Sequence, residues 1–341
     1  MPESAWEGAE VADNKRPVVN LRPPGFYTPD DVYKMVQSGQ MAPGRALVHL
    51  EAFDKGQGRR LAVRGEARDD ETLEVVLAEL DALVGLTKVK DLVREVQAFI
   101  AIQQRRSQER LVNQPLVLHM IFKGNPGTGK TTVARIFGKL FRQLGVLPKG
   151  HLVEIERADI VGEYIGHTAQ KTREQINKAL GGILFIDEAY SLARGGEKDF
   201  GKEAIDTLVK AMEDHKDELI LILAGYQREM ESFLQANTGL RSRFPIQIDF
   251  PDYRVSELLE IADLMLSQRE YRMAPEATGG LRDYLRRTQE VGERRGNARK
   301  VRNIIERAIR RHAVRLADRP SVSREQLMLI TGADIEEACE G

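Results

Sequence analysis

The chain has 341 residues, of which 42% are hydrophobic and 30% are charged, which is enough apolar material for a globular core and enough length for two or three structural units. Its formal net charge is −1, so it lacks the overall positive field by which proteins hold nucleic acid or an anionic membrane. The one cysteine, Cys339, excludes an intramolecular disulfide, and no signal-like apolar stretch follows Met1, so we expect a cytoplasmic protein with no membrane partner.

Residues 1–70 differ in composition from the rest of the chain. Residues 14–25 are polar and proline-rich, a composition typical of an extended lead. A short helix signal and an alternating, hairpin-like pattern follow them. We therefore expect a small N-terminal accessory module over residues 1–70.

From residue 71 onward the hydrophobic pattern is that of an α/β protein. Apolar residues recur every three to four positions over 73–80 and 89–100, which predicts two helices. Apolar runs that alternate with helical stretches then predict a parallel sheet with helices on both faces, its strands at 116–122, 152–155, 183–186, 219–224 and 244–250. Beyond Pro251 the pattern is helical only, with a long helix over 297–316. We expect a large α/β domain over 71–250 and a helical domain over 251–341.

A glycine-rich motif, Gly124-Asn-Pro-Gly-Thr-Gly-Lys-Thr131, follows the first of these strands and opens a helix. This G-x-x-x-x-G-K-[ST] pattern in this setting predicts a phosphate loop, whose backbone N–H groups and helix N-terminus bind the phosphates of a nucleoside triphosphate. Lys130 would reach the β- and γ-phosphates, and the Thr131 hydroxyl would bind Mg²⁺. The residues expected to contact ATP are Asn125, Pro126, Gly127, Thr128, Gly129, Lys130, Thr131 and Thr132.

A second motif, Ile183-Leu-Phe-Ile-Asp-Glu188, ends a buried strand with two carboxylates. The carboxyl end of a parallel strand is where an α/β sheet exposes its ligand-binding side chains. Asp187 would complete the Mg²⁺ site, and Glu188 would orient and deprotonate the attacking water. Together the two motifs predict ATP hydrolysis.

Five further strings, at 83–90, 163–168, 187–192, 223–226 and 239–244, make residues 75–335 resemble the CbbX/SpoVK group of AAA+ ATPases. The resemblance implies an AAA+ P-loop NTPase core over 71–250, a helical lid over 251–341, and a hexameric ring with nucleotide between neighbouring subunits. Residues 1–70 lie outside the resemblance.

The resemblance also implies roles for particular residues. Arg243, with Arg241 as an alternative, is expected to act as an arginine finger on the nucleotide of the adjacent subunit. Arg299, with Arg302 as an alternative, matches the position from which the lid contacts the phosphates. Val84 and Gly85 match the segment that contacts adenine.

One position departs from the family pattern. The polar residue expected at the end of the fourth strand falls at Gly225 or Tyr226, so the sequence does not say which group detects the γ-phosphate there.

The triplet Tyr164-Ile165-Gly166 matches the loop that AAA+ threading machines present to the axis of the ring. An aromatic side chain would grip polypeptide with little sequence preference, whereas the alternative is a tyrosine packed in the core. The loop 194–202, with Phe200 at its tip, is a second candidate pore loop.

These features predict an ATP-driven, hexameric remodeller of protein substrates that acts in spore formation. One alternative is a CbbX-like activase that frees an inhibited metabolic enzyme. Others are a nucleic-acid motor or clamp-loader relative, against which the near-neutral charge argues, and a small-molecule P-loop kinase, against which Glu188 and Arg243 argue.

Overall fold

The computed structural model describes residues 72–112, 117–164, 166–194, 200–290, 296–317 and 319–340. The expected N-terminal module lies outside the described residues, as do Ile165 and most of the second candidate pore loop.

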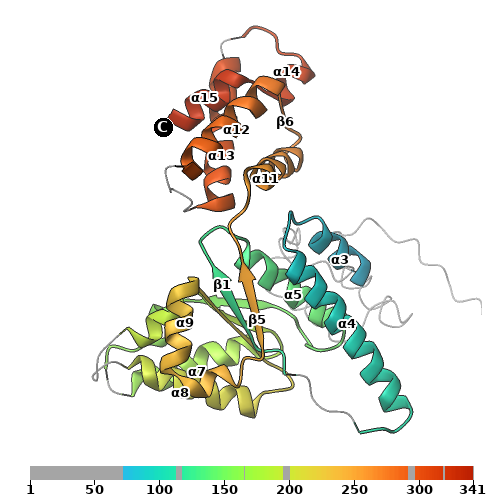
Figure 1. Ribbon diagram of the computed structural model, residues 1–341, viewed down its shortest axis with the longest axis vertical. Helices are drawn as coiled ribbons and strands as arrows, with labels where there is room; N and C mark the ends of the chain where they lie inside the picture. Colours follow the sequence, from blue (N-terminus) through green and yellow to red (C-terminus); the bar gives the residue numbers. More distant parts are fainter. Residues whose placement is uncertain are drawn as a thin grey trace, which may run out of the picture. The chain divides into compact units, whose positions relative to one another are not determined.

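The centre of the large domain is a five-stranded parallel sheet (Figure 1). Its strand order is β2-β3-β4-β1-β5, and Met120 of β1 lies opposite Ile222 of β4 and Ile246 of β5. The predicted parallel sheet is confirmed, although the first strand begins four residues later than the apolar run does. The strands are β1 (Met120–Gly124), β2 (Leu152–Ile155), β3 (Ile183–Ile186), β4 (Ile220–Gly225) and β5 (Ile246–Phe250).

Helices cover both faces of this sheet, as predicted (Figure 1). One face packs against α3 (Leu73–Asp81), α4 (Thr87–Gln108) and α5 (Lys130–Gln143). The other packs against α7 (His167–Ala179), the 3₁₀ helix η1 (Ala189–Ala193), α8 (Gly201–Asp214) and α9 (Gln227–Ala236). Two single-turn helices, α6 (Arg157–Ile160) and α10 (Thr238–Arg241), lie in the connections.

The strands are apolar at consecutive positions because successive side chains enter opposite layers. In β1, Ile121 packs into the layer of α7, α8 and α9, whereas Met120 and Phe122 pack into the layer of α3, α4 and α5. Phe122 centres an aromatic group with ring centroids 5.0 Å from Phe250 and 6.1 Å from Phe137. The sheet therefore holds the ends of β1, β3 and β4 in fixed relative positions.

Residues from Tyr253 onward form a second hydrophobic core of their own. The long helix that the sequence predicts over 297–316 is confirmed as α13, whose buried Val301, Ile304, Ile305 and Ala308 follow the helical period. The helices of this lid are α11 (Val255–Ser267), α12 (Pro275–Glu290), α13 (Asn297–Ala317), α14 (Arg324–Met328) and α15 (Gly332–Glu340).

The lid contains one element that the sequence did not predict. Two-residue strands, β6 (Arg272–Met273) and β7 (Leu329–Ile330), pair in parallel. Segments this short carry no detectable alternation, so a purely helical pattern was expected there.

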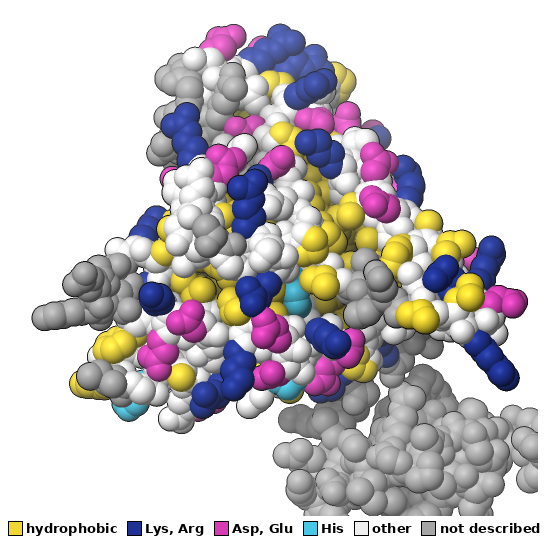
Figure 2. All heavy atoms as spheres, turned by 60° about the horizontal axis from the view of Figure 1, so that its bottom comes forward, with side chains coloured by type: hydrophobic (Ala, Val, Ile, Leu, Met, Phe, Trp, Pro, Cys, Tyr) yellow, Lys and Arg dark blue, Asp and Glu magenta, His cyan; other side chains and the backbone are white. Residues whose placement is uncertain are grey.

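The described surface is mixed in charge on the face that Figure 2 presents, where Lys and Arg side chains are interspersed with Asp and Glu. Among the described residues, no helix combines the length and the apolar composition that crossing a membrane requires.

Candidate nucleotide-hydrolysis site

The predicted phosphate loop connects the carboxyl end of β1 to the N-terminus of α5. Gly127 and Gly129 adopt φ values of 74° and 95°, which L-residues with a Cβ rarely adopt. Gly129 is the N-cap residue of α5 and provides no side-chain cap, so the first N–H groups of the helix are not used by a capping side chain. Such a loop and helix end together suit an anion.

Lys130, the first residue of α5, lies across this loop. Its ammonium donates to the carbonyl oxygens of Gly124 at 2.8 Å and Asn125 at 2.9 Å. Burial lowers the pKa of Lys130, an effect that the carboxylates of Asp187 and Glu188 oppose and the charge of Arg299 reinforces. The charges of the two predicted acids and of the predicted lid arginine thus all act on the predicted lysine.

Asp187 and Glu188 directly follow β3, whose carboxyl end lies at the same edge of the sheet as the phosphate loop. The Glu188 N–H donates to the Asp187 carboxylate at 2.9 Å. Glu188 itself has a left-handed backbone, with φ 46° and ψ 42°, at the turn into η1. A non-glycine residue in that region costs on the order of 1 kcal/mol or more, and such strain occurs preferentially at functional sites.

The residues expected to bind Mg²⁺ provide suitable oxygen donors. Thr131 supplies a hydroxyl and Asp187 a carboxylate, which are the hard ligands that Mg²⁺ prefers. The Thr131 hydroxyl also lies 3.5 Å from a carboxylate oxygen of Glu154 on β2, an acidic neighbour that the motif search missed. The donor set therefore fits the ion that the sequence implies. Thr132, the next residue, is exposed.

The lid meets the phosphate loop at the start of α13. The Ala298 N–H donates to the Gly127 carbonyl at 3.1 Å. A Cβ on Gly127 would collide with the Gly296 carbonyl oxygen and lie 2.9 Å from the Arg299 nitrogen. Glycine is thus required here for close backbone approach as well as for its φ. Arg299 is exposed beside the loop, and Arg302 is exposed one turn further along α13.

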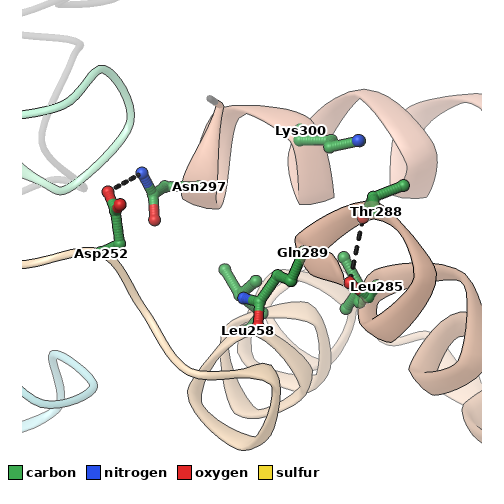
Figure 3. A pocket seen from close by; sticks show the side chains of 7 residues that line it. All are labelled: Asp252, Leu258, Leu285, Thr288, Gln289, Asn297 and Lys300. Carbon is green, nitrogen blue, oxygen red and sulfur yellow. Dashed lines mark hydrogen bonds between the residues drawn. The ribbon is translucent and has the colours of Figure 1, made fainter. Parts of the chain in front are cut away.

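A polar network that the motif search did not detect joins the loop to the lid. The Asn125 amide donates to the Asp252 carboxylate at 2.9 Å. The Asn297 amide donates to the same carboxylate at 2.8 Å, as Figure 3 shows. The Asn297 side chain also donates to the Pro126 carbonyl at 3.3 Å and accepts from the Tyr253 N–H at 3.0 Å. Asp252 therefore links one amide of the loop to one amide of the lid.

The segment expected to contact adenine lies beside the same network. A Cβ on Gly85 would lie 3.0 Å from the Glu257 carboxylate and 3.8 Å from the Tyr253 ring. Val84 is partly buried against the lid core. The Tyr253 hydroxyl donates to the Thr128 carbonyl at 3.2 Å, so this tyrosine contacts both segments.

Arg243 is not part of this cluster. Arg243 lies just before β5, which runs parallel to β1 and begins level with it, Ile246 opposite Met120. The phosphate loop follows the far end of β1, so Arg243 lies at the opposite edge of the sheet from the loop. Its guanidinium donates to Glu213 of α8 at 2.6 and 3.2 Å and to the Gly239 carbonyl at 2.9 Å. Arg243 therefore lies away from the phosphate loop of its own chain. Arg241 is exposed.

The candidate pore residues lie between α6 and α7. The Tyr164 side chain is 66% exposed, which is inconsistent with the alternative of a core tyrosine. Among the described aromatic pairs, its ring pairs only with that of His167, in an edge-on arrangement with the ring centroids 5.5 Å apart. Gly166, at φ 83°, caps α7, and a Cβ there would have no described atom within 4 Å. Ile165 lies outside the described residues.

Phe200 differs from expectation. It directly precedes α8 and is half-buried, and is therefore not at the tip of a loop. Residues 195–199 of that candidate loop are outside the described residues.

Two parts of the chain match known domains. Residues 120–252 match the ATPase family associated with various cellular activities (AAA), and residues 254–341 match the AAA lid domain. The chain belongs to the AAA+ ATPases, and it is a nucleotide-binding enzyme that hydrolyses ATP.

Within that class the chain is similar to stage V sporulation protein K of Bacillus subtilis (strain 168), with 57% identity over 265 residues, 77% of this chain and 82% of that protein. It is also similar to protein CbbX of Cereibacter sphaeroides, with 51% identity over 245 residues, 71% of this chain and 78% of that protein. A solved structure of a mutant RuvB from Thermotoga maritima shares the fold at 18% identity and a TM-score of 0.50, covering 79% of this chain and 72% of that one. The predicted resemblance to the CbbX/SpoVK group is confirmed.

Proposed function

We propose that the protein is a ring-forming, ATP-driven remodeller that engages polypeptide substrates through a central pore and acts in spore formation. The observation that carries the proposal is the exposure of Tyr164, a large aromatic side chain that packs into no core. The similarity to stage V sporulation protein K supports the cellular setting. The domain boundaries at residues 70 and 250 remain predictions.

In this proposal the phosphate-loop backbone and Lys130 hold the triphosphate, and Thr131 and Asp187 hold Mg²⁺. Bound Mg²⁺ would neutralise charge on the β- and γ-phosphates. Glu188 accepts the proton of the attacking water, and Arg299 contacts the phosphates from the lid. Arg243 of a neighbouring subunit completes the site, which agrees with its distance from the loop of its own chain.

The mixed surface charge argues against the alternative of a nucleic-acid motor. A motor that tracks nucleic acid needs a basic groove along the phosphate backbone. The net charge of −1 and the interspersed charges in Figure 2 do not favour that alternative. The similarity to CbbX favours a second candidate, the release of an inhibited metabolic enzyme by the same pore.

Site-specific crosslinking tests the pore directly, because the sequence has a single cysteine. We would replace Cys339 by Ala and introduce Tyr164→Cys, then add ATP and a short bis-maleimide in the slowly hydrolysing Glu188→Gln background. Each subunit then carries one thiol, and each thiol forms one thioether bond, so residues that surround one axis should join neighbouring subunits into covalent dimers. The matched control is Val314→Cys in the lid, which is equally exposed at 66% and should give no dimers.

Two outcomes would contradict the proposal. A hexamer in sedimentation without crosslinked Tyr164→Cys dimers would place this residue away from the axis. A chain that stays monomeric with ATP would refute the ring itself. Proteins retained by the Glu188→Gln ring from sporulating cells, compared with those retained by a Lys130→Ala control, would then distinguish the two candidate settings.

A further inference from the structure

Three successive carbonyl groups of the phosphate loop accept hydrogen bonds from residues of the lid. In loop order, Pro126 accepts from the Asn297 side-chain amide at 3.3 Å, Gly127 from the Ala298 N–H at 3.1 Å, and Thr128 from the Tyr253 hydroxyl at 3.2 Å. The lid thus fixes the part of the loop that lies just before α5.

The hydrogen bonds on these carbonyls set the direction of the N–H groups of the loop. In a planar trans peptide the C=O and the N–H of one unit point in opposite directions. Holding the carbonyls of residues 126–128 toward the lid donors therefore turns the N–H groups of residues 127–129 away from those donors. The positive φ values of Gly127 and Gly129 let successive N–H groups converge, and such a concavity binds anions. The lid donors thus stabilise the backbone conformation that a phosphate requires.

Tyr253 is the donor whose contribution the removal of one atom can isolate. Tyr253 is 8% exposed and Thr128 is 1% exposed, so water has little access to their hydrogen bond. The backbone of the tyrosine is also fixed, because its N–H donates to Asn297 Oδ1 at 3.0 Å and its carbonyl accepts from the Gln289 amide at 3.1 Å. Without the hydroxyl, the buried Thr128 carbonyl would lose this donor, which generally costs more than losing a hydrogen bond that water can replace.

We propose that Tyr253 is a positioning residue for nucleotide binding, whose hydroxyl, through the Thr128 carbonyl, turns the Gly129 N–H toward the bound phosphates. The inference goes beyond the proposed function, because it concerns the phosphate loop of a single chain and requires neither a ring nor a pore. It also assigns to the start of the lid a part in shaping the anion site, separate from the phosphate contact expected of Arg299.

The protonation state of Tyr253 agrees with this role. Burial, followed by the charge of Glu257, raises the pKa of Tyr253 to about 12. The hydroxyl therefore keeps its proton at neutral pH and donates to the Thr128 carbonyl, which can only accept. The direction of this hydrogen bond is accordingly fixed, as the positioning of a loop carbonyl requires.

The experiment removes the hydroxyl and keeps the ring. In Tyr253→Phe, the dissociation constants of ATP and of inorganic triphosphate, measured by displacement of a fluorescent ATP analogue, should both rise about tenfold, the effect of leaving one buried carbonyl unpaired. The kcat at saturating ATP should change by less than about twofold, because the groups that act on the water are untouched. A matched control is Tyr271→Phe in the lid, where the ring packs edge-on against His312 with the centroids 5.5 Å apart. Both dissociation constants should keep their wild-type values in this control.

Inorganic triphosphate distinguishes an effect on the phosphate loop from an effect on the base. The Tyr253 ring lies near Gly85, which is expected to contact adenine, so a loss of ATP affinity alone could arise at the base. Unchanged dissociation constants in Tyr253→Phe, or a loss for ATP without a loss for triphosphate, would overturn the inference while leaving the role of the loop intact. Triphosphate binding at wild-type affinity in Lys130→Ala would show that the phosphates bind elsewhere, and would overturn both.

Discussion

The buried histidine at the start of β1 should make the stability of the large domain sensitive to acid. His119 is 4% exposed, and its Nδ1 accepts a hydrogen bond at 3.0 Å from the Leu221 N–H of β4. The backbone of Met212 in α8 raises the pKa of the ring, against the larger effect of burial. The imidazole must be neutral for this arrangement, because a proton on Nδ1 would face the N–H of Leu221.

The size and sign of the effect follow from this geometry. Burial lowers the pKa of His119 from 6.5 to about 4, and the backbone of Met212 only partly opposes the change. Between these two values the unfolded chain binds more protons than the folded chain, so acidification favours unfolding. At about 1.4 kcal/mol per pKa unit, His119 should cost the fold about 2 kcal/mol at pH 5 relative to pH 7, and about 3 kcal/mol at pH 4.

The test is His119→Asn, which leaves an amide oxygen to accept from Leu221 and does not titrate. Denaturant unfolding followed by circular dichroism, at pH 7, 6, 5 and 4.5, gives the free energy of unfolding of both proteins. The stability difference between wild type and variant should change by about 2 kcal/mol from pH 7 to pH 5, in favour of the variant. A difference that is constant with pH would show that His119 is not buried in its neutral form.

Other predictions concern the hydrolysis site and its partners. Lys130→Ala should abolish nucleotide binding in equilibrium titration, whereas Glu188→Gln should bind normally and turn over about 10²-fold or more slowly; normal turnover would refute the base assignment. Arg243→Ala should bind ATP but hydrolyse it poorly, and mixing it with Glu188→Gln subunits should restore activity, unless the arginine does not act across the interface. Gly127→Ala should weaken nucleotide affinity and loosen the lid to proteolysis, because its Cβ would collide with the lid backbone; unchanged affinity would refute the close approach. Tyr164→Ala should retain basal hydrolysis but lose stimulation by a remodelled substrate, and Tyr164→Phe should retain both; loss of folding in Tyr164→Ala would instead support a packing role.

The sequence predicted those parts of the site that depend on local pattern. The phosphate loop and the acids after β3 are short motifs next to apolar runs, and parallel strands necessarily bring their carboxyl ends to one edge of the sheet. The lid arginine was expected only through the resemblance, since nothing in the local pattern brings α13 to the loop.

The parts that the sequence did not predict depend on contacts between distant residues. Asp252 binds Asn125, 127 residues away, and Asn297, 45 residues away, so no window of sequence contains the network. His119 resembles any polar residue at a strand end until α8 and β4 enclose it.

Because the first residue of α13 is bonded to the network beside the phosphate loop, a small movement of the loop is amplified along this helix. Asn297 is the first residue of this helix of 21 residues, whose far end lies about 30 Å from the phosphate loop. A rotation of only about 5° around this point, such as a sub-ångström shift of the loop carbonyls could cause, would displace the far end of the helix by about 3 Å. The hydrogen bonds that join Asn125, Asp252 and Asn297 lie at the point of rotation. A change too small to disturb the sheet would therefore produce a much larger displacement at the far end of α13.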